Sequence, residues 1–271
     1  MPTQTLTFLA KEIHHRVPFA YYDSSDRAGD IGFIHGFSVP PRYYEPFLLR
    51  LSRSYTIVAP EIAGINRYFP QPKTIDECTD MYLDFFEEIQ YSDCNGYESL
   101  REFAPEFLVG HSLGGAIAIA MSEILDVKGV VAINPVMPVT YGALEIVRRG
   151  LSVGFEAMGK KKTGFLLSMI PGYLANIAAG VRAVPLILSD ICRYGFDHTD
   201  GTALDIRTPT LIVFSKRDQL FGKSMTEDTR ERIEKSFRDY DLVTNNYQHD
   251  YPLEHPERAA KLVLDWIRTR F

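Results

Sequence analysis

The chain has 271 residues, a length typical of one α/β domain with an inserted segment. It is 45% hydrophobic and 24% charged, as expected of a globular protein with a large core. Its net charge of -6 and pI near 5.7 argue against a nucleic-acid-binding protein, because such proteins usually have a basic face.

Cysteine usage and hydropathy narrow the class of protein further. Cys78, Cys94 and Cys192 are far apart and odd in number. This predicts a reducing compartment such as the cytoplasm, with neither a disulfide framework nor a zinc site. The first ten residues lack a basic segment, so no signal peptide is expected. Prolines and charged residues interrupt the most apolar stretch, residues 164–192, so no membrane span is expected.

Strand and helix patterns alternate along the first half of the chain. Two opening strands, at residues 3–9 and 19–22, are expected to pair antiparallel. They are followed by a strand at 31–34, a helix at 43–51, a strand at 55–59, an amphipathic helix at 74–89, a strand at 107–109 and an apolar helix at 112–125. This alternation predicts an α/β fold with a mostly parallel central sheet and helices on both faces.

The second half departs from this alternation between residues 135 and 205. After a strand at 127–133, helical segments are interrupted by several glycines and by Pro171-Gly172. Alternation returns with strands at 210–214 and 241–244 and a closing helix that begins at Pro256. We therefore expect a core of residues 1–134 and 206–271, with an inserted helical cap of residues 135–205.

The most specific motif is Gly110-His111-Ser112-Leu113-Gly114, a GxSxG sequence between an apolar strand and an apolar helix. In this setting the serine lies on a strained turn, where small residues two positions before and after it relieve backbone crowding. The helix start beyond the serine directs N–H dipoles toward a developing oxyanion. The alternative is a turn that only packs the helix on the sheet, but the flanking elements favour a nucleophile.

A second motif, His35-Gly36-Phe37, ends another buried strand. An acyl-transfer site needs two N–H donors directed at one oxygen. We expect the backbone N–H groups of Phe37 and Leu113 to be these donors. A His-Gly pair alone would indicate only a turn, but together with the serine motif it favours an oxyanion hole.

A serine nucleophile needs a base, and the base needs an orienting acid. Asp218 follows the strand at 210–214, and the chain order serine, acid, histidine fits this fold class. A turn-forming Asp is the alternative, but the rival loop after residue 133 has no carboxylate. Two histidines, His249 and His255, compete to be the base. His249 lies in a loop just after the last predicted strand, whereas His255 precedes Pro256, where a structural role fits better. We predict that Ser112, His249 and Asp218 form a triad.

With these residues the chain resembles the α/β-hydrolase fold superfamily, and within it the capped serine hydrolases of esterase and lipase type. The resemblance covers nearly the whole chain. It rests on HGF at 35–37, GHSLGG at 110–115, LIVFSKRD at 211–218 and HDYPLEHPE at 249–257. It implies the same triad and oxyanion donors. The HPE start of the closing helix supports His249 over His255 as the base.

The resemblance implies hydrolysis of a carboxylic ester or thioester through an acyl-enzyme, with no cofactor and no metal. The same triad could act on a lactone or on a carbon–carbon bond beside a ketone, and a slowly turning-over ligand-binding receptor is a third possibility. Epoxide hydrolysis and dehalogenation are not expected, because they resemble cases with Asp in place of Ser112. We expect a small-molecule substrate with an apolar part. Its pocket is predicted to include His111, Val136, Leu166, Ile170 and Leu220.

Overall fold

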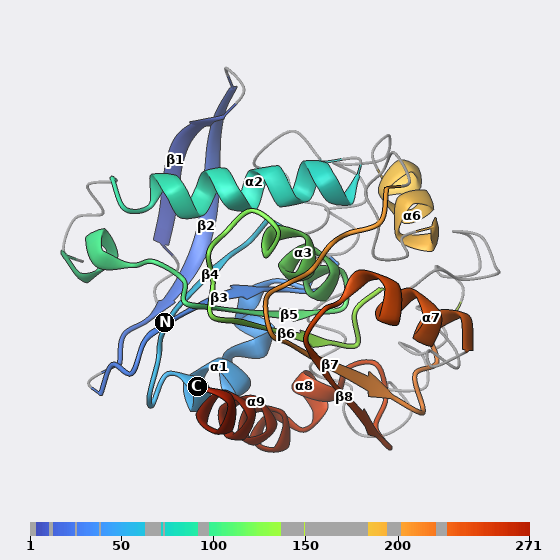
Figure 1. The fold of residues 1–271 in the computed structure, drawn as a ribbon. Helices are drawn as coiled ribbons and strands as arrows, with labels where there is room; N and C mark the ends of the chain where they lie inside the picture. The colour runs from blue at the N-terminus through green and yellow to red at the C-terminus, as the bar shows by residue number, and fades with distance from the viewer. Residues whose placement is uncertain are drawn as a thin grey trace.

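The computed structural model describes residues 4–10, 13–24, 26–37, 39–62, 72, 74–91, 98–136, 149, 184–193, 202–220 and 227–271. The described residues form one sheet of eight strands in the order β1-β2-β4-β3-β5-β6-β7-β8, with helices on both faces (Figure 1). β1 (Gln4–Ala10) pairs antiparallel with β2 (Ile13–Tyr22), and β2 pairs antiparallel with β4 (Thr56–Pro60). All other neighbouring strands in this sheet are parallel, which confirms the predicted fold class.

The strands of the parallel part lie close to their predicted positions. Besides β4 they are β3 (Asp30–Ile34), β5 (Phe107–His111), β6 (Gly129–Ile133), β7 (Thr210–Ser215) and β8 (Tyr240–Asn245). Every residue of β3 to β7 is buried, because helices cover both faces of the sheet. In the antiparallel part, β2 begins at Ile13, earlier than the predicted Phe19.

One face of the sheet is covered by α2 (Ile75–Glu88), α3 (Leu113–Met121) and α7 (Glu227–Ser236) (Figure 1). The side chain of Thr74 accepts a hydrogen bond from the Glu77 N–H at 3.1 Å, which caps the start of α2. α3 is buried along its whole length. α6 (Val184–Arg193) buries Ile187 and Ile191 in the same core.

The opposite face is covered by α1 (Glu45–Leu51), α8 (Tyr251–Glu254) and α9 (Pro256–Arg270), with the short 3-10 helix η1 (Pro41–Tyr44) before α1. α1 and α9 lie side by side below the sheet in Figure 1. The indole Nε1–H of Trp266 donates to Asp241 of β8 at 2.7 Å. This hydrogen bond ties the closing helix to the edge of the sheet. A second 3-10 helix, η2 (Glu98–Glu102), precedes β5.

Three helices differ from expectation, and one of them is the short α8, which was not predicted. The helix predicted over residues 112–125 ends at Met121, because the Ser122 hydroxyl donates to the Ile119 carbonyl and competes with a further helical turn. α7 has no counterpart among the predicted elements. Its sequence is mostly polar and it buries only Thr229, Ile233 and Ser236. A helix with so narrow a buried side has no strong apolar periodicity to reveal it.

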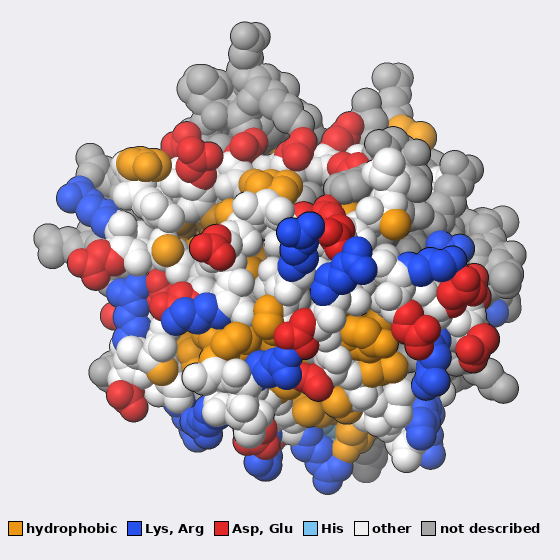
Figure 2. Space-filling model, in the orientation of Figure 1, with side chains coloured by type: hydrophobic (Ala, Val, Ile, Leu, Met, Phe, Trp, Pro, Cys, Tyr) orange, Lys and Arg blue, Asp and Glu red, His pale blue; other side chains and the backbone are white. Residues whose placement is uncertain are grey.

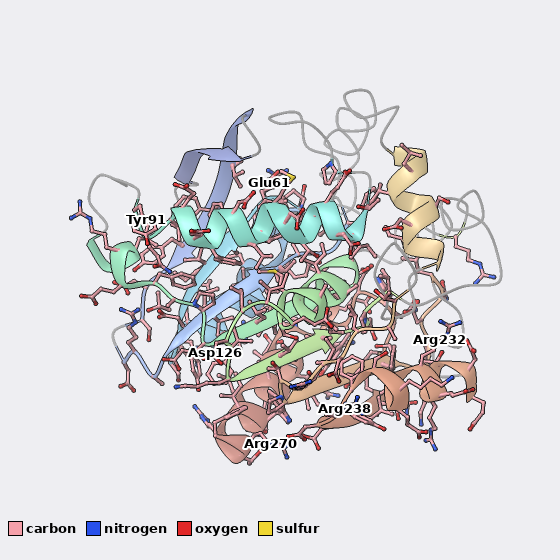
Figure 3. The ribbon with its side chains drawn as sticks, turned by 45° about the horizontal axis from the view of Figure 1, so that its top comes forward. Glu61, Tyr91, Asp126, Arg232, Arg238 and Arg270 are labelled. Atoms are coloured by element: carbon pink, nitrogen blue, oxygen red, sulfur yellow. The ribbon has the colours of Figure 1, made fainter. Side chains whose placement is uncertain are left out.

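The surface mixes charges of both signs. On the face drawn in Figure 2, Asp and Glu side chains gather along the upper part, near the acidic helix α2, Lys and Arg side chains gather along the lower edge, and both signs mix in between. Arg238 and Arg270, labelled in Figure 3, pair with Asp205 and Asp239 respectively. Within the described ranges, no helix is both long enough and apolar enough to cross a membrane. Most of the predicted cap, residues 135–205, lies outside the described residues.

Candidate active site

Ser112 lies between the end of β5 and the start of α3 in a backbone conformation that non-glycine residues rarely adopt. Its φ is 56° and its ψ is -122°. Such a conformation costs about 1–3 kcal/mol and persists only where the surroundings enforce it. Here the Ser112 N–H donates to the Ile133 carbonyl at 2.9 Å, and the Ser112 carbonyl accepts from the Gly115 N–H at 2.9 Å. The turn therefore presents the serine side chain at the carboxyl end of the sheet.

The glycines on either side of the serine are required by close backbone contacts. A Cβ at Gly110 would lie 2.1 Å from the Gly114 carbonyl oxygen. A Cβ at Gly114 would lie 2.1 Å from the Ile34 carbonyl oxygen. Both distances are far below van der Waals contact, so only glycine fits at these positions. The strand, the turn and the helix can pack this closely for that reason alone.

Ser112, His249 and Asp218 form one continuous hydrogen-bonded chain. The Nε2 of His249 lies 2.8 Å from the Ser112 Oγ, and its Nδ1 lies 2.7 Å from the Asp218 Oδ2. An ionised carboxylate only accepts, so Nδ1 has the proton and Nε2 accepts from the serine hydroxyl. All three residues are buried, with 5–6% of each exposed. The structure thus brings together the three residues predicted as a triad.

The surroundings of His249 act in opposite directions on its protonation. Burial alone would lower its pKa. The charge of Asp218 and its hydrogen bond outweigh burial, with a smaller contribution from Asp250, so the pKa of His249 is raised above its usual value of 6.5. Asp218 is itself held in place, because its Oδ1 accepts from the Leu220 N–H at 2.9 Å. An imidazole in this setting can accept a proton from the serine and have its charge stabilised.

The two predicted oxyanion donors lie on segments adjacent to the serine. Leu113 is the first residue of α3, so its N–H has no intrahelical partner. Phe37 follows Gly36 in the loop after β3, where a Cβ at Gly36 would lie 3.3 Å from the Ser112 Cβ. The loop after β3 and the start of α3 therefore approach the serine together.

The residues predicted to line a pocket have different positions. Val136 is buried, and its N–H donates to the Ser112 carbonyl at 3.3 Å. Leu220 is half-buried beside Asp218. His111 is fully buried, with hydrogen bonds at both ring nitrogens. Leu166 and Ile170 lie outside the described residues.

The rival base, His255, packs against the rings of Tyr247 and Tyr251, whereas the histidine hydrogen-bonded to the serine is His249. His255 occupies the N-cap position of α9 without a side-chain capping hydrogen bond, and its ring centroid is 4.4 Å from that of Tyr247.

Two residues that the sequence did not single out contact this site. The Tyr44 hydroxyl hydrogen-bonds to His111, and the Asn134 side chain hydrogen-bonds to the His249 carbonyl. Asn134 directly follows β6 with a positive φ of 45°, a conformation that asparagine tolerates. No sequence signal marks Tyr44.

Among the described residues there is no group of three or more His, Cys, Asp or Glu side chains suited to a metal ion.

A mostly parallel sheet with a serine on a strained strand-to-helix turn is the architecture of the α/β hydrolases. The chain matches the model of the alpha/beta hydrolase family over residues 33–262 and therefore belongs to that family.

Solved structures of similar fold cover nearly the whole chain. An esterase from Thermogutta terrifontis has a TM-score of 0.68 at 14% identity, covering 100% of this chain and 99% of its own. A serine hydrolase of carbazole degradation, CarC, has a TM-score of 0.67 at 18% identity, covering 99% and 100%. An esterase from Exiguobacterium antarcticum has a TM-score of 0.63 at 16% identity, covering 98% and 100%. Identities this low show the shared fold alone. No curated protein sequence matches the chain.

Proposed function

We propose that the protein is a serine hydrolase that cleaves a carboxylic ester or thioester through an acyl-enzyme. The observation that supports this most directly is the unbroken chain from the Ser112 hydroxyl through His249 to Asp218, with both contacts at 2.7–2.8 Å. A serine hydroxyl is a weak nucleophile at neutral pH, and this arrangement supplies the base and the orienting acid that it needs.

In the proposed acylation, the Ser112 Oγ attacks the carbonyl carbon of the ester and its proton passes to the His249 Nε2. The negative charge that develops on the carbonyl oxygen accepts hydrogen bonds from the N–H groups of Phe37 and Leu113. The carbon–oxygen bond to the leaving group then breaks. The departing alcohol takes the proton from the His249 Nε2, which leaves an acyl-serine.

In the proposed deacylation, water replaces the alcohol. It gives a proton to the His249 Nε2 while its oxygen attacks the acyl carbon. The tetrahedral intermediate breaks down to a carboxylic acid, and the proton returns to the Ser112 Oγ. Asp218 stabilises the imidazolium in both steps and keeps the ring in the tautomer that the reaction requires.

The proposed substrate has an apolar acyl part. Val136 and Leu220 are apolar side chains whose backbones hydrogen-bond to Ser112 and Asp218, so they lie close to where an acyl group would be held. We further propose that residues 135–205, including Leu166 and Ile170, form a cap over this position and shield the acyl-enzyme from bulk water.

A fluorophosphonate probe tests the nucleophile directly. Incubation of the purified protein with the probe, followed by peptide mapping, should place one label on Ser112, and pre-treatment should abolish hydrolysis of p-nitrophenyl butyrate. Ser112→Ala should be unlabelled and should lose on the order of a millionfold in kcat. Ser122→Ala is the matched control, because Ser122 is another buried serine at the opposite end of α3 from Ser112, and this variant should label at the wild-type rate. Labelling of another residue, or retained turnover in Ser112→Ala, would exclude the proposal.

A further inference from the structure

The backbone carbonyl of His249 is held by two buried side chains from neighbouring strand ends. The His111 Nε2, at the end of β5, lies 2.9 Å from the carbonyl oxygen, and the Asn134 Nδ2, just after β6, lies 2.7 Å from it. Both side chains are only 1% exposed. His249 itself lies in the short connection between β8 and α8. Its peptide group is thus fixed by groups outside that connection.

The direction of each hydrogen bond follows from the chemistry. A carbonyl oxygen only accepts, so the His111 Nε2 has its proton and its Nδ1 accepts. The donor to Nδ1 is the Tyr44 hydroxyl at 2.7 Å, and the Tyr44 oxygen accepts in turn from the Gly36 N–H at 3.2 Å. One buried relay therefore joins the loop after β3 to the carbonyl of His249.

His111 stays neutral in this relay. The pKa of His111 is lowered to about 3, mainly by burial and to a smaller extent by the charge of the neighbouring His249. The ring therefore remains a single donor and a single acceptor across the neutral pH range, and the hydrogen bonds do not reverse.

Asn134 suits its position in two respects. Its φ of 45° is in the left-handed region, which asparagine and glycine tolerate best. Its N–H donates to the Val213 carbonyl at 2.7 Å, so the backbone is fixed to β7 while the side-chain amide reaches His249. Glycine would keep this backbone and remove only the amide, which makes Asn134→Gly an informative substitution.

We propose that Asn134, His111 and Tyr44 are positioning residues, which aim the His249 ring at Ser112 and Asp218 by fixing the His249 peptide group. The inference rests on the proposed function, in which His249 is the base. The ring must satisfy contacts of 2.8 Å and 2.7 Å on opposite sides at once. A displacement of about 1 Å in such a site can cost on the order of a hundredfold in rate.

The first test separates positioning from stability. Asn134→Gly and Tyr44→Phe should each lower kcat for p-nitrophenyl butyrate by about tenfold or more, with KM within about twofold of wild type. Tyr82→Phe is the matched control, because it removes the hydroxyl of another fully buried tyrosine, in α2, and it should leave kcat unchanged. Tyr44→Phe removes a single oxygen, so it remains informative if Asn134→Gly does not fold. Lower melting temperatures with normal kcat for the folded variants would show a purely structural role and overturn the proposal.

The second test asks whether these residues act through His249. The rate of fluorophosphonate labelling is measured for His249→Ala alone and in combination with Asn134→Gly or Tyr44→Phe. If the residues only position His249, the second substitution should change the residual rate by less than about twofold, since coupled residues are non-additive. A further tenfold loss in the double variants would overturn the positioning role. Normal turnover in His249→Ala would instead exclude the proposed function itself, so the two failures are distinguishable.

Discussion

At the scale of single residues, the chemistry of the site depends on the hydrogen bonds that orient each side chain. Asp218 accepts hydrogen bonds at both oxygens, one from the His249 Nδ1 and one from the Leu220 N–H. His249 makes one hydrogen bond on each side of its ring. Because each of these groups has a defined partner, removing one group should have a different effect on catalysis from removing another.

The two candidate bases should respond differently to alanine. His249→Ala should lower kcat toward p-nitrophenyl butyrate by on the order of a millionfold, because the serine loses its proton acceptor. His255→Ala should leave kcat near wild type and lower the melting temperature by a few degrees, because it removes the ring packed on Tyr247. Steady-state kinetics and thermal unfolding of both variants check this. An inactive His255→Ala beside an active His249→Ala would reverse the identification of the base.

The pH dependence should report His249. The rate requires neutral imidazole, so kcat/KM should rise with pH, with its midpoint above 6.5 because the pKa of His249 is raised. Asp218→Asn removes the charge that raises this pKa and leaves the burial that lowers it, so the midpoint should move to lower pH. The same substitution should reduce kcat by up to about ten-thousandfold through loss of the correct tautomer. A midpoint that does not move in Asp218→Asn would contradict this account.

At the scale of elements, the site depends on how closely β5, its turn and α3 approach β3. The close approach of Gly114 to the Ile34 carbonyl lets the start of α3 lie directly against the loop that contains Phe37. A larger residue would push the helix start and the loop apart. The geometry of the serine turn is therefore a property of two packed strand–helix units, as well as of the motif.

Gly114→Ala and Gly115→Ala should separate these packing effects. In Gly114→Ala the added methyl would lie 2.1 Å from a backbone oxygen, so the free energy of unfolding should fall by at least about 3 kcal/mol. In Gly115→Ala the methyl would lie 3.2 Å from Pro135, and alanine favours helix by up to about 1 kcal/mol, so the change should be within about 1 kcal/mol of zero. Urea unfolding curves measure both. Equal midpoints would show that the backbone yields at Gly114.

At the scale of the whole molecule, the parallel sheet gathers distant segments at one edge. Ser112, Asn134, Asp218 and His249 all follow the carboxyl ends of neighbouring strands, from β5 to β8. Sites in open α/β sheets usually form at this edge, because the loops there converge. We therefore propose that the substrate binds over the ends of these strands, below the proposed cap.

A series of p-nitrophenyl esters tests the apolar acyl site. Each buried methylene is worth about 0.8 kcal/mol, or about fourfold in binding. Lengthening the acyl chain from two to six carbons should raise kcat/KM by up to about two orders of magnitude, until the site is full. Leu166→Asp and Ile170→Asp should abolish this gain if the proposed cap lines the site, and the exposed position Leu186→Asp is the control. A flat series for the wild type would exclude an apolar acyl site.

Much of the fold could be predicted because its signals are local. Alternating apolar strands and helices predicted the sheet, and apolar periodicity predicted α2 and α9. α7 was missed because its buried side is narrow. Its formation is instead favoured by packing of Ile233 and by ion pairs four residues apart, Arg232 with Asp228 and Lys235 with Glu231.

The sequence alone predicted the candidate triad, because a GxSxG turn, an Asp after a strand and a His in the loop after the last strand each have a recognisable local setting. Only the tertiary structure shows which buried side chains from distant parts of the sequence contact these residues and their neighbours. Asn134 and Tyr44 reach His249 and His111 across 115 and 67 residues of chain. No local pattern encodes such contacts, because they depend on the order in which the parallel strands are placed beside one another.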